Sequence, residues 1–149
     1  MMCSSRASMA GVVYVEEAPV RLDPDALRSH LNTEGCGAVV SFVGITRGTE
    51  GDADVIRLEF DAWQDRLQPV LHDLAQQAID TFGVGAVAMA HRTGHVGPQE
   101  PIVAIHVASP HRKEAFVACE WLIDELKRQA PIWKKEVTTA GETWKEGLG

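Results

Sequence analysis

The chain of 149 residues contains only three cysteines and no apolar run of membrane-spanning length, and both shortages narrow the class of protein. The cysteines are odd in number and lack the spacing of a metal site or a redox motif. We therefore expect no disulfide framework and a cytoplasmic location. Residues 1–11 lack the apolar segment of a secretory signal and are expected to form a disordered leader, with residues 12–149 as a single domain.

Positive charge is also scarce, because 14 lysines and arginines stand against 21 aspartates and glutamates and leave a net charge of -7. That balance argues against a general nucleic-acid binder, which needs a broad basic face. The six histidines form no cluster with the spacing of a zinc site. No phosphate-binding or dinucleotide-binding fingerprint is present either. We expect no metal ion and no cofactor, and neither nucleic acid nor a membrane as a partner.

Segments of alternating or β-branched residues predict strands, and amphipathic segments predict helices. We expect strands near residues 12–15, 38–43, 55–61, 84–91, 101–108, 132–137 and 143–145. Helices are expected near residues 23–31, 65–82 and 109–130, with Asp23 as the N-cap of the first. Residues 44–54 are interpreted as an exposed loop and residues 92–100 as a turn. The mixed order, with at least one hairpin, indicates an α+β domain with a largely antiparallel sheet.

The most informative segment runs from Ser109 to Glu136. Ser109 is a favourable N-cap and Pro110 suits the first helical position. The helix is expected to end at Ala130, because a residue before proline is pushed out of the helical region. One apolar stripe at helical spacing is predicted to face the core: Phe116, Cys119, Ile123 and Leu126.

The same segment concentrates positive charge in an otherwise acidic chain: His111, Arg112, Lys113, Lys127, Arg128, Lys134 and Lys135. Lys127 lies at the margin of the apolar stripe, where partial burial lowers the pKa of an ammonium group. If the strand after Pro131 folds back, Lys134 becomes its neighbour, and repulsion between like charges lowers the pKa further. Such a pair is able to bind an anion and transfer protons near neutral pH. A lysine that extends along the helix edge into solvent is the alternative interpretation of Lys127.

Three other polar residues are candidates for function or for packing. Arg47 follows the strand at 38–43, where its guanidinium is able to bind a phosphate or carboxylate, or to remain solvated. His106 lies within an apolar strand and is expected to be a hydrogen-bonded core residue. Cys119 is expected to be a buried packing residue, with a sulfur-carrying persulfide as the alternative.

The sequence SPHRKEAFVACEWLIDELKRQAPIWKKE, residues 109–136, resembles the signature of the catalytic (large) subunit of molybdopterin synthase. That family carries Ser-x-His-Arg at a helix start, Leu-Lys at its end, and then Ala-Pro-Ile/Phe-Trp-Lys-Lys/Arg-Glu. Its Gly-x-x-Arg after a strand is matched by Gly44-Ile45-Thr46-Arg47, although some members have a lysine where this chain has Ile45. The resemblance extends from Val12 to Trp144.

The resemblance implies an α/β-hammerhead-like fold and an enzyme of molybdenum cofactor biosynthesis. Such an enzyme converts cyclic pyranopterin monophosphate to molybdopterin by inserting two dithiolene sulfurs. The sulfur donor is the thiocarboxylate at the C-terminal Gly-Gly of a small ubiquitin-like subunit, whose tail enters the large subunit. The family assembly is a heterotetramer built around a homodimer of large subunits.

The resemblance also implies roles for particular residues. Lys127 and Lys134 are the implied catalytic residues, with Lys127 near the partner's terminal glycine and Lys134 as a general acid that stabilises negative charge. His111 and Arg112 would hold the substrate phosphate, at a helix end that favours anions. The other residues implied to line the site are Ile45, Thr46, Arg47, Lys135 and Glu136.

Two other functions remain open from the sequence. A non-catalytic module that captures a carboxylate-ended tail would use the arginines without a proton-transferring lysine. A sulfurtransferase could instead carry sulfur on its own Cys119.

Overall fold

The computed structural model describes residues 12–63 and 65–145. The strands in these residues form two sheets, and the first sheet lies at the centre of the molecule. Its strand order is β1-β5-β7-β2, which leaves β2 at an edge. Only β1 and β5 run parallel within this sheet, and the other neighbours are antiparallel. The bounds are Val13–Ala18 for β1, Ala38–Ile45 for β2, Ala86–Arg92 for β5 and Pro101–Ser109 for β7.

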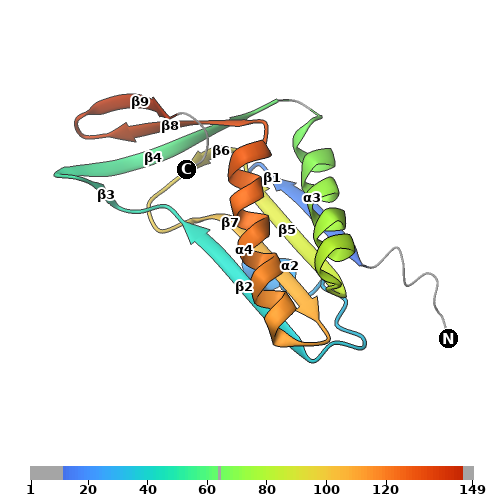
Figure 1. The fold of residues 1–149 in the computed structure, drawn as a ribbon. Coiled ribbons are helices and arrows are strands. Elements are labelled where there is room, and N and C mark those ends of the chain that lie inside the picture. Colours follow the sequence, from blue (N-terminus) through green and yellow to red (C-terminus); the bar gives the residue numbers. More distant parts are fainter. Residues whose placement is uncertain (1–11, 64, 146–149) are drawn as a thin grey trace.

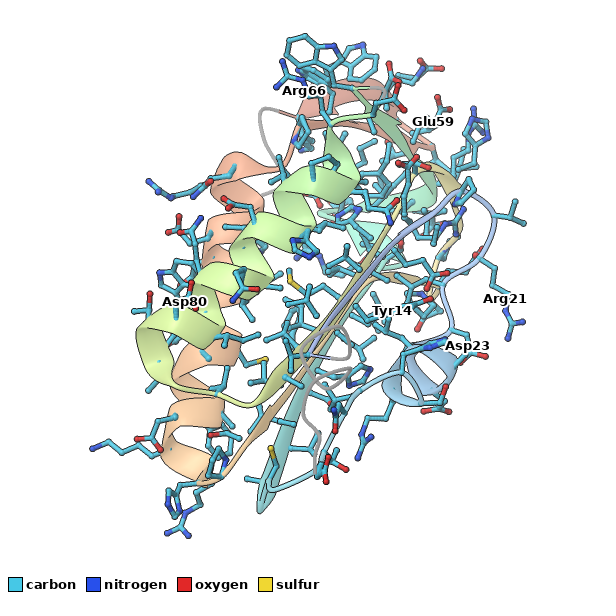
Figure 2. The ribbon with its side chains drawn as sticks, turned by 90° about the vertical axis from the view of Figure 1, so that its right-hand side faces the viewer. Tyr14, Arg21, Asp23, Glu59, Arg66 and Asp80 are labelled. Carbon is cyan, nitrogen blue, oxygen red and sulfur yellow. The ribbon has the colours of Figure 1, made fainter. Side chains whose placement is uncertain are left out.

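Helices cover both faces of this sheet. The long helices α3 (Leu67–Phe82) and α4 (Arg112–Gln129) lie side by side on one face (Figure 1). The short helix α2 (Pro24–Arg28) covers part of the other face, so that Asp23 and Asp80 lie on opposite sides of the sheet in Figure 2. The main core forms between the sheet and the two long helices. None of the described helices is long and apolar enough to cross a membrane.

A second sheet lies across the C-terminal end of α4 (Figure 1). Its order is β3-β4-β8-β9, with β6 paired to β4, and all of these pairings are antiparallel. The bounds are Thr49–Glu50 for β3, Ala53–Ala62 for β4, Gly94–Val96 for β6, Ile132–Thr138 for β8 and Gly141–Lys145 for β9. The chain leaves α4 at Ala130, whose extended backbone turns it into β8.

The predicted α+β class with mostly antiparallel pairing is confirmed, as are the hairpin after β8 and the end of α4 at Ala130. Two predictions for connecting segments were wrong, because residues 44–54 contain β3 and residues 92–100 contain β6. Both strands are very short and form only by pairing with β4, which no local pattern reveals. The expected leader, residues 1–11, lies outside the described residues.

The predicted start of α4 was also wrong. Ser109 is the last residue of β7, where it pairs with Ala38, and its side chain is buried. The N-cap is His111, with an extended backbone and no side-chain capping bond. Sheet pairing therefore continues past the point at which the sequence favours a helix.

The face that α4 turns to the core differs from the predicted stripe. Phe116 is 61% exposed, whereas Ala115, Ala118 and Leu122 are fully buried beside Cys119 and Leu126. The predicted stripe was right for Cys119 and Leu126, and Ile123 packs against the core, whereas Phe116 was wrong because Ala115 and Ala118 face the sheet in its place. The prediction counted the larger apolar residues of the helix and left out the alanines.

Capping provides a test of these boundaries. Asp23→Ala is expected to lower the free energy of unfolding by about 1 kcal/mol, because the Asp23 carboxylate accepts two backbone N–H groups at the start of α2. Ser109→Ala should leave stability unchanged or raise it, because the lost hydroxyl is buried without a partner. Urea denaturation followed by circular dichroism measures both. Asp23→Asn keeps an acceptor oxygen and should lose little, whereas a clear loss in Ser109→Ala would contradict the assigned boundary.

Candidate active site

A cavity of about 310 Å³ opens where the two sheets and the C-terminal end of α4 meet. Its apolar lining is supplied by both sheets and by α4. Its polar lining carries three cationic side chains in a protein of net negative charge. The polar and charged residues around it are Thr46, Arg47, Thr49, Glu50, His91, Lys127, Lys134 and Glu136.

Lys127 and Lys134 meet at this cavity from two consecutive elements. Lys127 stands in the last turn of α4, and Lys134 follows in β8 after the reversal at Pro131. Burial lowers the pKa of Lys134, and the positive charges of Lys145, Lys127 and Arg47 lower it further, while Glu136 opposes the shift. The structure thus brings together the two lysines that the sequence predicted to be neighbours.

Alternation along β8 separates Lys135 from these two lysines. The ammonium of Lys135 lies 3.1 Å from Glu142 Oε1 and 3.3 Å from Glu59 Oε1, on the face of the sheet that turns away from the cavity. Figure 2 shows Glu59 at the end of the molecule where the second sheet lies. Lys135 therefore does not line the site, because neighbouring strand residues point to opposite faces.

Glu136 returns to the cavity side, as predicted, and its carboxylate is buried there. Its Oε1 atom lies 3.7 Å from the ammonium of Lys145 in β9. Two elements of the second sheet thus place a paired carboxylate beside Lys134. This pairing limits the positive charge that the cavity accumulates.

The segment after β2 holds Arg47 at the entrance. The backbone N–H of Thr46 donates to the Glu100 carbonyl at 3.0 Å, and the Thr46 carbonyl accepts from the N–H of Gln99 at 2.8 Å. The Arg47 side chain is 81% exposed and contacts Glu50 through Nη2 and Oε2 at 3.5 Å. Residues 44–54 are therefore fixed at Thr46, while the guanidinium remains accessible to an anion.

His111 and Arg112 do not reach this cavity within one chain. They line a separate hollow with Gly37, Ala38, Pro110 and Lys113 at the opposite end of α4. Lys127 follows His111 by 16 positions along α4, and a rise of about 1.5 Å per position puts them about 24 Å apart. The expectation of a single cradle formed by both helix ends was wrong for one copy of the chain, because the length of α4 keeps its termini apart.

His106 and Cys119 have the packing roles expected from the sequence. His106 is buried between Ser41 Oγ at 2.6 Å and the Pro24 carbonyl at 2.9 Å. Burial raises the pKa of the Cys119 thiol to about 11. A thiol that stays protonated is a poor nucleophile, which argues against sulfur transfer through Cys119.

Sequence reasoning missed His91, Glu50 and most apolar residues of the cavity, although it included Ile45. His91 was considered only with the other histidines as a possible metal ligand, and Glu50 was not singled out. His91 lies in β5 of the first sheet and Glu50 in β3 of the second, so the packing of the two sheets brings them to the same cavity. Within the described ranges, no group of three or more His, Cys, Asp or Glu residues is placed to hold a metal ion.

The arrangement is suited to anionic reactants that need a proton. Three cations concentrate positive potential at a hollow with apolar walls, where electrostatic interactions are stronger than in bulk water. A lysine with a lowered pKa releases its proton more readily than a solvated one.

A family model and several known proteins match the sequence of this chain. The family model described as "MoaE protein" matches residues 16–129. A molybdopterin synthase catalytic subunit of Caulobacter vibrioides is 40% identical over 113 residues, which are 76% of this chain and 74% of that protein.

Two solved structures have the same fold. The molybdopterin synthase structure from Staphylococcus aureus matches with a TM-score of 0.83 and 29% identity, over 88% of this chain and 96% of that one. A complex of subunits 1 and 2 of molybdopterin-converting factor from Helicobacter pylori matches with a TM-score of 0.72 and 26% identity, over 89% and 90%.

The neighbouring lysines of β8 should respond oppositely to removal of their charge. Folding lowers the pKa of Lys134 from 10.5, so Lys134→Met is expected to raise the free energy of unfolding at neutral pH, with a gain that vanishes as pH rises toward 10.5. Hydrogen bonds to Glu142 and Glu59 raise the pKa of Lys135 from the same value. Lys135→Met should therefore lower stability below pH 10.5 and lose its effect at higher pH.

Urea denaturation across this pH range measures both effects, and each variant serves as the control for the other. Destabilisation by Lys134→Met at neutral pH would contradict the assigned environment of that side chain.

Proposed function

The chain belongs to the MoaE protein family of molybdopterin synthase catalytic subunits, and we propose that the cavity between α4 and β8 is where it transfers sulfur. It is a sulfurtransferase of molybdenum cofactor biosynthesis. The proposed substrate is cyclic pyranopterin monophosphate, which receives two dithiolene sulfurs. The proposed donor is the C-terminal Gly-Gly thiocarboxylate of a small ubiquitin-like subunit. The expected compartment is the cytoplasm, where the free thiols of Cys36 and Cys119 remain reduced.

The pairing of Lys127 and Lys134 at one cavity carries this proposal. Both reactants are anions, and the two ammonium groups with Arg47 supply the charge that would bind them. Lys134, whose pKa is lowered by burial, would act as the general acid and stabilise developing negative charge. Lys127 is more exposed and would contact the terminal glycine of the entering tail. Ile45, Thr46 and Glu136 would complete the lining.

A second copy of the chain would bring His111 and Arg112 to the substrate phosphate. The edge strand β2 starts at Ala38, next to the N-terminal end of α4, and ends at Ile45 beside the cavity. Two β2 strands that pair antiparallel across a two-fold axis would place Ala38 of one copy opposite Ile45 of the other. Each cavity would then receive His111 and Arg112 from the neighbouring copy. This arrangement agrees with the proposed homodimer within a heterotetramer.

A non-catalytic module that binds a carboxylate-ended tail is the other function to test. It would use Arg47 and the lysines only as charges. The lowered pKa of Lys134 favours the enzyme, because tail binding alone does not require an ammonium group that gives up its proton more readily than a solvated lysine.

Substitution of the lysines separates these functions. Lys127→Ala and Lys134→Ala are each expected to reduce turnover of cyclic pyranopterin monophosphate with thiocarboxylated small subunit by about a hundredfold or more. Binding of the small subunit, measured by calorimetry, should largely survive. Arg21→Ala removes an exposed positive charge that lines neither hollow, and it serves as the control. Turnover that persists in both cavity variants would make the catalytic assignment wrong.

Mixing of variants tests the contribution of a second copy. Lys134→Ala and Arg112→Ala subunits are each expected to be nearly inactive alone. Random mixed dimers should recover roughly a quarter of wild-type activity, because half of the dimers are mixed and each holds one intact site. The matched control combines Lys127→Ala with Lys134→Ala, where both sites stay defective and no recovery is expected. A lack of recovery in the first mixture would contradict the shared site.

A further inference from the structure

Among the polar residues that line the cavity, only Thr46 is less exposed than His91. The proposed reaction gives His91 no role. It belongs to β5 in the central sheet and is 2% exposed. Its ring packs edge-on against Phe60 of β4, with 5.3 Å between the ring centres. Two sheets therefore fix the orientation of the imidazole.

A backbone carbonyl determines which nitrogen of this ring carries the proton. His91 Nδ1 lies 2.7 Å from the carbonyl oxygen of Arg92, and a carbonyl only accepts hydrogen bonds. The proton of the neutral ring is therefore on Nδ1, and Nε2 holds a lone pair. Among the described residues, no hydrogen bond engages Nε2.

The orientation of the ring leaves Nε2 as the nitrogen available to a ligand. His91 lines the cavity, and the hydrogen bond to the Arg92 carbonyl occupies Nδ1. A ligand in the cavity would therefore meet Nε2 rather than Nδ1.

Burial, helped by nearby positive charges, keeps the imidazole of His91 neutral. Burial lowers the pKa of His91 to about 4, and the positive charges of Arg92 and Lys134 act in the same direction, while the hydrogen bond to the Arg92 carbonyl opposes them. The ring therefore acts as a hydrogen-bond acceptor at neutral pH and does not add to the positive charge of the cavity.

The other acceptors of the cavity are differently placed. Glu50 is paired with Arg47 at the entrance, Glu136 is paired with Lys145, and the hydroxyl of Thr46 is completely buried. An anionic group of a ligand would be drawn to the cations, whereas a neutral N–H or O–H group would find in His91 an acceptor that is not already paired with a cation. A molecule with an anionic end and a donor-bearing ring satisfies both requirements, and a pterin monophosphate has this form.

We propose that His91 is a substrate-binding residue whose Nε2 accepts a hydrogen bond from a ring N–H or hydroxyl group of the pterin substrate. The inference rests on the proposed function and specifies how the cavity distinguishes the two ends of that substrate. A ligand without a donor at this position leaves a buried acceptor unsatisfied, which penalises its binding.

Kinetics of two variants test the contact. His91→Phe keeps a planar ring against Phe60 and removes the acceptor, so the KM for cyclic pyranopterin monophosphate should rise about tenfold, with kcat changed far less. His91→Gln offers an amide oxygen near the position of Nε2 and should recover much of the loss. Affinity for the small subunit should stay the same in both. A wild-type KM in a folded His91→Phe protein would overturn the inference.

Nitrogen NMR of the wild-type protein provides a test that needs no variant. In ¹⁵N-histidine-labelled protein, His91 Nε2 should resonate as an unprotonated nitrogen and shift on saturation with cyclic pyranopterin monophosphate. His106 is the internal control, because both of its nitrogens are already engaged away from the cavity. An unmoved His91 signal in protein that turns over the substrate would overturn this inference alone. Absence of turnover in the wild-type complex would instead overturn the proposed function.

Discussion

Burial of the Lys134 ammonium group beside other cations is the constraint on which the site depends, and the fold has to hold that side chain at the cavity. Lys127 is fixed by α4, whose buried face packs on the central sheet. Lys134 is fixed by β8, which pairs along most of its length with β4 and β9. The reversal at Pro131 joins the two elements directly, so sheet pairing and core packing hold the main chain at both lysines in place. The buried carboxylate of Glu136 offsets part of the repulsion and makes the arrangement tolerable.

The acidic composition of the chain confines the attraction for anions to the basic cavity. The chain carries a net charge of -7, yet Arg47, Lys127 and Lys134 line the same small hollow. A field concentrated in this way draws anions to one place, whereas an evenly basic surface would bind polyanions without selection. Lys135 shows the complementary arrangement, since its charge is neutralised by Glu59 and Glu142 on the other face of the same strand.

The sequence sufficed where function depends on residues close together along the chain. Lys127 and Lys134 were predicted as neighbours because a helix end, a proline and a strand lie in succession. Sequence reasoning failed where the position of a residue depends on the length of a helix or on pairing between distant strands. His111 and Arg112 were grouped with the lysines because of the family resemblance, although the length of α4 separates them within one chain. Lys135 was included for the same reason, although the alternation of β8 turns it to the other face of the sheet. His91 and the strand β6 depend wholly on pairing between distant segments, and Phe116 was placed inward by its size.

The double backbone attachment of Thr46 has a consequence for how reactants enter and leave. Its N–H and carbonyl are both bonded to residues 99–100, so the main chain at the entrance is anchored to the neighbouring turn. Arg47, the next residue, keeps a solvated side chain with one weak ionic contact. Movement of the Arg47 guanidinium therefore takes place by side-chain rotamer exchange, which in exposed residues takes picoseconds to nanoseconds. A small anion that arrives at the entrance would thus meet a cation able to adjust to it without any rearrangement of the main chain.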